Sequence, residues 1–193
     1  LSPNTKEGFR RLTSLYLCCC RGNIRVFVEN APIHNLATFR FVSWDDSGSD
    51  CDIGTRVVMK CRLLTKIDLV LPYLNSSSCL LKMIECCPDL EKFFIIKNGI
   101  TSVSLKRIDI QTISTLPRLR NLEIDANIEA GAIKGLTSCK SLKYLALPRP
   151  LDLSDVLPII GGNLIGLEWG MPWGDNVKYS LAQCNKLQYC SLW

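Results

Sequence analysis

A short pattern of apolar positions recurs along the whole chain: apolar, two variable residues, apolar, one variable residue, apolar. Successive copies begin 24, 28, 26, 29, 23, 22 and 23 residues apart. Their alternation is typical of a strand with one buried face. A repeat period of roughly 20–29 residues predicts a solenoid of similar units. The eight copies are Leu12/Leu15/Leu17, Leu36/Phe39/Phe41, Leu64/Ile67/Leu69, Leu90/Phe93/Ile95, Leu119/Leu122/Ile124, Leu142/Leu145/Leu147, Leu164/Leu167/Trp169 and Leu187/Cys190/Leu192.

Cysteine occupies a fixed place relative to this pattern. Cys61, Cys87, Cys139 and Cys184 each stand three residues before the first apolar position of their copy. A further column follows three residues after the last apolar position, where asparagine or cysteine side chains satisfy backbone groups as the chain turns. Proline can replace them there because it has no backbone N–H to satisfy. This column includes Cys20, Trp44, Pro72, Asn98, Asn127, Pro150 and Pro172.

Segments 87–95 (CPDLEKFFI) and 139–147 (CKSLKYLAL) resemble the leucine-rich repeat family. Within it, they resemble the cysteine-containing, ribonuclease-inhibitor-like subtype found in F-box/leucine-rich repeat proteins. The resemblance implies an α/β fold: a horseshoe-shaped leucine-rich repeat solenoid of about eight repeats, with a parallel β-sheet on the concave face and helices or loops on the convex face. We expect residues 1–193 to form a single domain that is a fragment of a longer chain.

Two of the segments between the copies carry clear helix signals. Residues 79–86 are apolar with helical spacing, follow serines that can cap a helix, and end before Pro88. Residues 104–116 predict a second helix that ends at Pro117. Its expected inward face consists of Leu105, Ile108, Ile113 and Leu116.

The remaining connecting segments are shorter or more polar. Residues 45–54 are acidic and rich in serine and glycine, so we interpret them as a surface loop before a helix at 57–63. Residues 2–8 either begin a short helix or end a preceding repeat. Further short helices are expected at 130–137, at 155–160 with an end at Gly161 and Gly162, and at 175–183.

Charge and apolar runs exclude two kinds of partner. The chain has 23 Lys+Arg and 18 Asp+Glu, and its net charge of +5 is spread evenly, with 12 basic and 10 acidic residues in 1–96 and 11 and 8 in 97–193. This even spread lacks the basic stripe of a nucleic-acid binder. No apolar run approaches the roughly 18–20 residues of a membrane span, and no secretory signal is visible. We therefore expect no nucleic acid, no membrane and a cytoplasmic or nuclear location.

Candidate catalytic and metal chemistry is sparse. The single histidine, His34, leaves no imidazole pair for acid–base or triad chemistry, and no phosphate-binding or hydrolase motif occurs. The 11 cysteines lack the two spaced pairs of a structural zinc site. Buried free thiols are favoured over disulfides or metal because several cysteines fall in repeat columns. We expect no enzyme, no cofactor and no metal.

Side chains between the apolar strand positions should point to the concave face in three columns. The first reads Ser14, Thr38, Lys66, Lys92, Asn121, Tyr144, Gly166, Tyr189; the second Tyr16, Arg40, Asp68, Phe94, Glu123, Ala146, Glu168, Ser191; the third Cys18, Val42, Val70, Ile96, Asp125, Pro148, Gly170, Trp193. An apolar patch with a charged rim is typical of a protein interface. The candidate partner-binding residues are Tyr16, Arg40, Lys66, Asp68, Val70, Lys92, Phe94, Ile96, Asn121, Glu123, Asp125 and Tyr144.

Three functions remain open. The resemblance implies a protein-interaction scaffold, the client-binding part of an F-box-type ubiquitin-ligase receptor whose Skp–cullin components bind through a region outside this chain. The alternative is a sensor in which Arg40, Lys66 and Lys92 converge on a small ligand or anion. A purely structural member of a larger assembly is the third possibility, because a fold does not determine a function.

Overall fold

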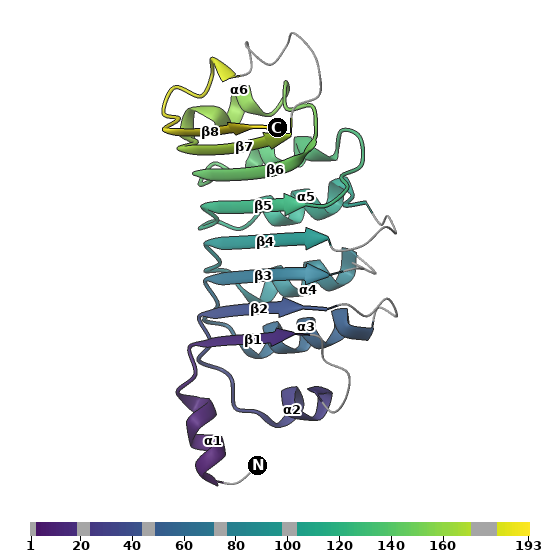
Figure 1. The fold of residues 1–193 in the computed structure, drawn as a ribbon, viewed down its shortest axis with the longest axis vertical. Coiled ribbons are helices and arrows are strands. Elements are labelled where there is room, and N and C mark those ends of the chain that lie inside the picture. The colour runs from purple at the N-terminus through teal and green to yellow at the C-terminus, as the bar shows by residue number, and fades with distance from the viewer. Residues whose placement is uncertain (1–2, 19–23, 44–48, 72–76, 98–103, 171–180) are drawn as a thin grey trace.

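In the computed structural model, eight parallel strands form one sheet in sequence order (Figure 1). The structure describes residues 3–18, 24–43, 49–71, 77–97, 104–170 and 181–193. The strands are β1 (Ser14–Cys18), β2 (Thr38–Val42), β3 (Lys66–Leu71), β4 (Lys92–Lys97), β5 (Asn121–Asp125), β6 (Tyr144–Pro150), β7 (Gly166–Gly170) and β8 (Tyr189–Leu192). This arrangement confirms the predicted α/β leucine-rich repeat solenoid.

The register follows the apolar pattern of the sequence. Equivalent positions of neighbouring repeats are paired throughout: Phe41 pairs with Leu69, and Leu69 with Ile95. The pattern residues are buried in β2 to β7, so the side chains of one sheet face form a continuous core. Burial of these aliphatic and aromatic side chains is the main driving force for stacking one repeat on the next.

A regular set of backbone hydrogen bonds joins successive repeats where the strands begin. One carbonyl oxygen, on the residue before each strand, accepts hydrogen bonds from two consecutive N–H groups of the next repeat. The Thr65 carbonyl, for example, accepts from the amides of Glu91 and Lys92 at 2.8 and 2.9 Å. The same arrangement recurs in every repeat from β1 to β8, which fixes the register of the sheet.

In the view of Figure 1, α1 and α2 lie beyond β1 at the N-terminal end, and helices α3, α4 and α5 lie behind the sheet. They cover the apolar sheet face, and the opposite face, here called the open face, carries none of the described helices. The helical elements are α1 (Pro3–Arg10), α2 (Ile24–Asn30), α3 (Ser49–Lys60), α4 (Ser77–Cys86), α5 (Arg107–Ser114), η1 (Ala132–Ser138), α6 (Leu157–Ile160) and η2 (Gly161–Asn163).

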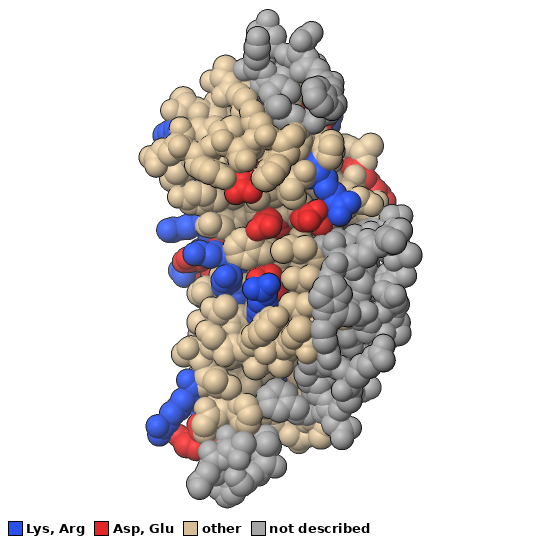
Figure 2. All heavy atoms as spheres, in the orientation of Figure 1, with Lys and Arg blue, Asp and Glu red and all other residues tan. Residues whose placement is uncertain are grey.

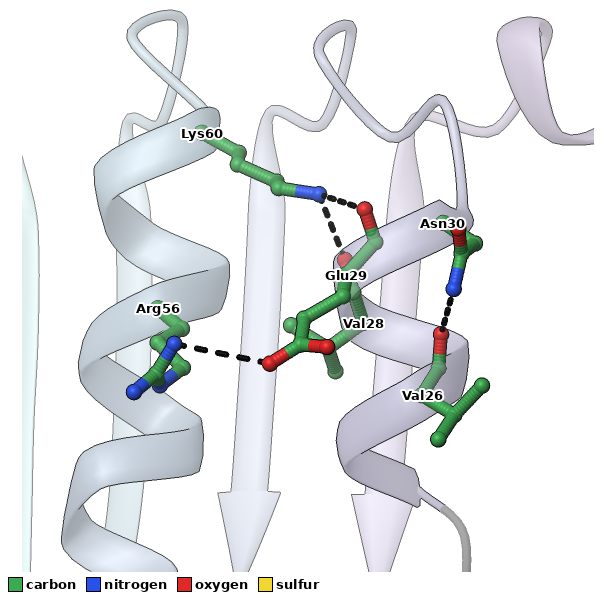
Figure 3. Close-up of polar contacts among 6 residues, drawn as sticks. All are labelled: Val26, Val28, Glu29, Asn30, Arg56 and Lys60. Carbon is green, nitrogen blue, oxygen red and sulfur yellow. Dashed lines mark hydrogen bonds and ion pairs between the residues drawn. The ribbon is translucent and has the colours of Figure 1, made fainter.

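Helix α2, which the sequence analysis did not predict, is held against α3 by polar contacts (Figure 3). Lys60 donates to the carbonyl oxygens of Val28 and Glu29 at 2.7 and 2.6 Å. Arg56 forms an ion pair of 3.5 Å with the Glu29 carboxylate. The Lys60 ammonium thereby satisfies carbonyl groups at the C-terminal end of α2, where a positive charge is favourable.

The prediction of a loop at 45–54 is wrong for residues 49–54, which are helical. Helix α3 begins at Ser49 and ends at Lys60, so the helix expected at 57–63 starts earlier and ends earlier. Gly54 lies on the buried side of this helix, where an added Cβ would be 3.3 Å from the Phe41 ring. The serine and glycine content indicated a loop, but the glycine allows close packing of the helix against β2.

The helix expected at 104–116 is shorter than predicted, and three of the four residues expected to face inward are buried: Leu105, Ile113 and Leu116. It spans Arg107–Ser114, and Leu105 instead forms an isolated parallel bridge with Ile128. Ile108, which we placed inside, is 55% exposed. The buried carboxylate of Asp109 turns back to accept a hydrogen bond of 2.8 Å from the Lys106 amide. The helix thus begins at this capping contact, with Ile108 on its exposed side and Ile110 in the core.

The short helices expected further along are present with changed bounds. The helix at 130–137 is the 3₁₀ helix η1, and the one at 155–160 begins only at Leu157. Gly161 and Gly162 do not end the helical path, because they continue it as η2. Of the two interpretations of residues 2–8, the short helix agrees with α1, which spans Pro3–Arg10. Most of the helix expected at 175–183 lies outside the described residues.

Candidate interaction surface

The open face is built from the residues that alternate with the core positions along each strand. The pairing Thr38–Lys66–Lys92–Asn121–Tyr144 runs across five adjacent strands in the first column. The second column runs in the same way from Tyr16 through Ser191. In Figure 2, basic atoms gather just below the middle of this face and acidic atoms just above it.

The register places all twelve candidate partner-binding residues in these columns, but their accessibility differs. Tyr16, Arg40, Lys92 and Tyr144 are exposed. Val70 is only 9% exposed, so it offers a partner little of the apolar contact expected of it. The other candidates are half-buried: Lys66, Asp68, Phe94, Ile96, Asn121, Glu123 and Asp125.

Two of the predicted cations are already engaged within the open face. Arg40 lies over the Tyr16 ring, with 5.3 Å from its Cζ to the ring centroid, and its Nε is 3.4 Å from Asp68 Oδ2. The Lys66 ammonium lies 5.2 Å from the centroid of Phe94. Such cation–π contacts hold the cationic side chains against the sheet. An anion bound by the predicted sensor would compete with these contacts for Arg40 and Lys66.

A second ion pair, which the sequence analysis missed, lies at the other end of the acidic region. Arg149 donates from Nε to Asp125 Oδ1 at 2.9 Å and from Nη1 to Asn127 Oδ1 at 3.0 Å. Arg149 follows the third column by one residue, so the pattern of columns did not select it. Its guanidinium joins the ends of β5 and β6 and neutralises one acidic side chain of the open face.

Two open-face carboxylates are left without a cation among the described residues, on Glu123 and Glu168. Burial raises the pKa of Glu123 above its ordinary value of 4.5, and the nearby carboxylates of Glu168, Asp68 and Asp125 raise it further. The ionised form is therefore held in a region of unfavourable potential.

A hollow of about 180 Å³ opens between these two carboxylates. Its floor is formed by the small residues Ala146 and Gly166, and its sides carry the rings of Phe94, Tyr144 and Tyr189. Gly166 is required for this shape, because an added Cβ would be 2.5 Å from Tyr144 Cδ1. Tyr189 and Glu168 stand in the predicted columns but outside the predicted site, since linear columns do not show where side chains leave space.

The cysteine column lies on the opposite side of the sheet and forms no reactive site. Cys61 donates its thiol to the Ile33 carbonyl at 3.0 Å, and Cys87 donates to the Cys61 carbonyl at 3.8 Å. Burial raises the pKa of both thiols to about 12. The eight cysteines whose side chains the structure describes are free thiols. The predicted role of the column as buried small side chains is confirmed for Cys61, Cys87, Cys139 and Cys184.

In the described part of the chain, no three His, Cys, Asp or Glu side chains come together as a group that could hold a metal ion. The exposed His34 places Nδ1 3.2 Å from the Lys60 carbonyl oxygen. Within the described ranges we also find no helical segment with the length and apolar character that crossing a bilayer requires.

Comparison with known proteins finds similarity at the level of structure. No protein-family model matches the chain, and no curated protein matches it significantly. An internalin (inlF) from Listeria monocytogenes is similar at 18% identity and a TM-score of 0.49, over 87% of this chain and 50% of that one. A protein from Bacteroides fragilis is similar at 14% identity and a TM-score of 0.46, over 78% of this chain and 58% of that one.

The chain thus spans between half and three fifths of the length of these two structures. Its fold is an α/β solenoid of the leucine-rich repeat type, as the strand order, the repeated register and the continuous buried column show on their own.

Proposed function

We propose that this chain is a protein-interaction scaffold whose open face binds a protein client. The observation that carries the proposal is the open face itself, where exposed and half-buried aromatic and charged side chains stand in register across consecutive strands. Aromatic rings combined with a charged rim are typical of the surfaces that bind other proteins. The described helices cover the other side of the sheet and leave this face accessible.

The finer proposal is that the chain is the client-recognition domain of a longer F-box-type ubiquitin-ligase receptor. It is supported by the column of buried cysteines, which is the feature of the sequence that resembles this subtype. Skp and cullin components would bind through a region outside this chain. Free buried thiols fit a reducing compartment, so the proposed location is the cytoplasm or nucleus. The scaffold itself is proposed to carry no enzymatic activity.

The test is affinity purification of the full-length protein from cells that express it, followed by mass spectrometry. The open-face variant Tyr16→Ala/Lys92→Glu changes two exposed side chains, one of which is the ring that contacts Arg40. The matched control Ile108→Ala/Lys82→Glu makes the same kinds of change on α4 and α5, behind the sheet. We expect a client to be lost from the first variant and retained by the second.

Recovery of Skp and cullin with all three proteins would support the ligase assignment. Their absence from every purification, with a client still lost from the open-face variant, would remove the ligase role and leave the scaffold. Equal recovery of all partners by the wild type and both variants would contradict the open face as the client-binding surface.

A further inference from the structure

The hollow between β4 and β8 combines three features. It is concave, it is flanked by aromatic rings, and its charged groups all have the same sign. Among the described residues that line it, none is basic, and Glu123 and Glu168 supply its two ionisable carboxylates.

The register explains how the hollow arises. Ala146 pairs with both Glu123 and Glu168, so the two carboxylate positions lie two strands apart, about 10 Å along the sheet. Gly166 separates Tyr144 from Tyr189 in the neighbouring column in the same way. The two small residues therefore leave a low floor at the point where two acidic and two aromatic side chains face one another.

The two carboxylates of this hollow have no neutralising cation among the described residues. Asp68 and Asp125 are each neutralised by an arginine of the open face, through Arg40 and Arg149. Glu123 and Glu168 have no such neutralising contact among the described residues. The pKa of Glu123 is raised because burial and the neighbouring like charges disfavour its ionised form. A cation beside this carboxylate would oppose that effect.

We propose that this hollow binds one lysine or arginine side chain of the protein client. The aromatic rings would contact the flat or alkyl part of the side chain, and the two carboxylates would accept hydrogen bonds from its charged end. The size is suitable, because cavities of about 150 Å³ hold a benzene-sized group. This inference rests on the proposed scaffold function and assigns the chemistry of one client residue.

An acidic or purely apolar side chain does not fit this hollow. An acidic group would add a third negative charge beside Glu123 and Glu168. An apolar group would exclude water from both carboxylates without supplying a hydrogen-bond donor, which is costly for a charged group. A cationic side chain with an alkyl stem satisfies both the rings and the carboxylates.

The test is titration of the purified protein with two seven-residue peptides that differ only in the central side chain and its charge. Both have glycine and serine flanks; one carries a central arginine and the other citrulline, its neutral counterpart. Binding is followed by NMR shifts of the amides of Ala146 and Gly166 at low salt. We expect the arginine peptide to bind at least about tenfold more tightly, since a hydrogen bond to a charged group contributes roughly that much.

The variant Glu123→Gln/Glu168→Gln should reduce this preference to near parity, because both carboxylates are neutralised with little change of shape. The matched control Glu85→Gln/Glu129→Gln makes the same change of net charge at exposed positions outside the hollow and should keep the full preference. A second variant, Gly166→Ala, should weaken the arginine peptide by displacing the Tyr144 ring.

Equal affinities for arginine and citrulline, or the same loss in the control variant, would overturn the inference. The purification described above separates this outcome from failure of the scaffold function. A client lost from Tyr16→Ala/Lys92→Glu but retained by Glu123→Gln/Glu168→Gln would leave the scaffold standing and remove the hollow as a site. If open-face variants lose no client, the scaffold proposal fails whatever the peptides show.

Discussion

At the scale of single residues, the cysteine column shows how a reactive side chain becomes a structural one. Ile33 holds the column position in the repeat before Cys61, and its carbonyl accepts the Cys61 thiol. The next thiol in the column, Cys87, then donates to the Cys61 carbonyl. Each thiol thus fills a small apolar space and satisfies a backbone group of the preceding repeat.

These thiols should resist alkylation in the folded protein. At pH 8, an alkylating reagent should modify the exposed Cys18 and Cys190 before the buried Cys61 and Cys87, because only thiolates react and burial raises the pKa of Cys61 and Cys87 to about 12. Peptide mass spectrometry after timed labelling measures the rates, and urea should make them equal. Equal labelling without urea would contradict the buried column.

Glu123 should make the protein less stable as the pH rises. The folded chain keeps a proton on Glu123 at pH values where the unfolded chain has released it, so the free energy of unfolding falls from about the ordinary pKa of 4.5 upward. The variant Glu123→Gln, which is always neutral, should therefore be more stable than the wild type at pH 7.5. The difference should vanish at pH 4, as measured by urea unfolding.

A second variant controls for the change in net charge. Glu129→Gln changes the charge by the same amount at an exposed position. If it stabilised the protein as much as Glu123→Gln at pH 7.5, the effect would belong to the overall charge and the local explanation would be wrong.

At the scale of elements, the strands were predictable and the helices only in part. Each strand repeats the same apolar spacing against the same neighbours, so eight copies support one another. Helices behind the sheet differ from repeat to repeat, and α2 gave no clear signal because Val26 is exposed and its stabilising contacts come from α3. Helix α5 begins at a cap made by Asp109, a polar contact that the apolar period does not contain, and Ile108 lies on its exposed side.

The packing of η1 against α5 should tolerate no added methyl group. A Cβ at Gly135 would be 2.9 Å from the Gln111 backbone nitrogen, so Gly135→Ala should destabilise the protein by about 1–3 kcal/mol. Gly162→Ala is the matched control, because nothing lies within 4 Å of a Cβ there, and it should be neutral or stabilising by up to about 1 kcal/mol. Thermal or urea unfolding measures both, and equal effects would contradict the close approach.

At the scale of the whole molecule, the strand period placed the candidate site residues on the sheet face that the described helices leave open, but it did not predict the shape of that face. The columns follow from strand periodicity alone. The burial of Val70, the lean of Tyr144 over Gly166 and the reach of Arg149 to Asp125 depend on neighbours that are distant in the chain. The columns therefore contain the polar and aromatic residues of the hollow, but they do not show the space between those side chains.

A cavity-forming substitution in the core of a middle repeat should destabilise mainly the neighbouring repeats. Phe93 is fully buried, and Phe93→Ala should cost about 3–5 kcal/mol. Because repeats contact only their neighbours, hydrogen exchange should lose protection most in β3 to β5 and progressively less toward β1 and β8. Hydrogen-exchange mass spectrometry measures this gradient. A uniform loss over all the described strands would show that the solenoid unfolds as one unit.

The paired amides that join each carbonyl to the next repeat, such as those of Glu91 and Lys92 on Thr65, also have a mechanical meaning. Inter-strand hydrogen bonds lie across the strands, so here they run along the long axis of the solenoid. Tension applied between the two ends would load these bonds along their own direction and open them one repeat at a time. The molecule would then extend in a series of small steps at low force. Each repeat that unfolds would add its own contour length to the chain.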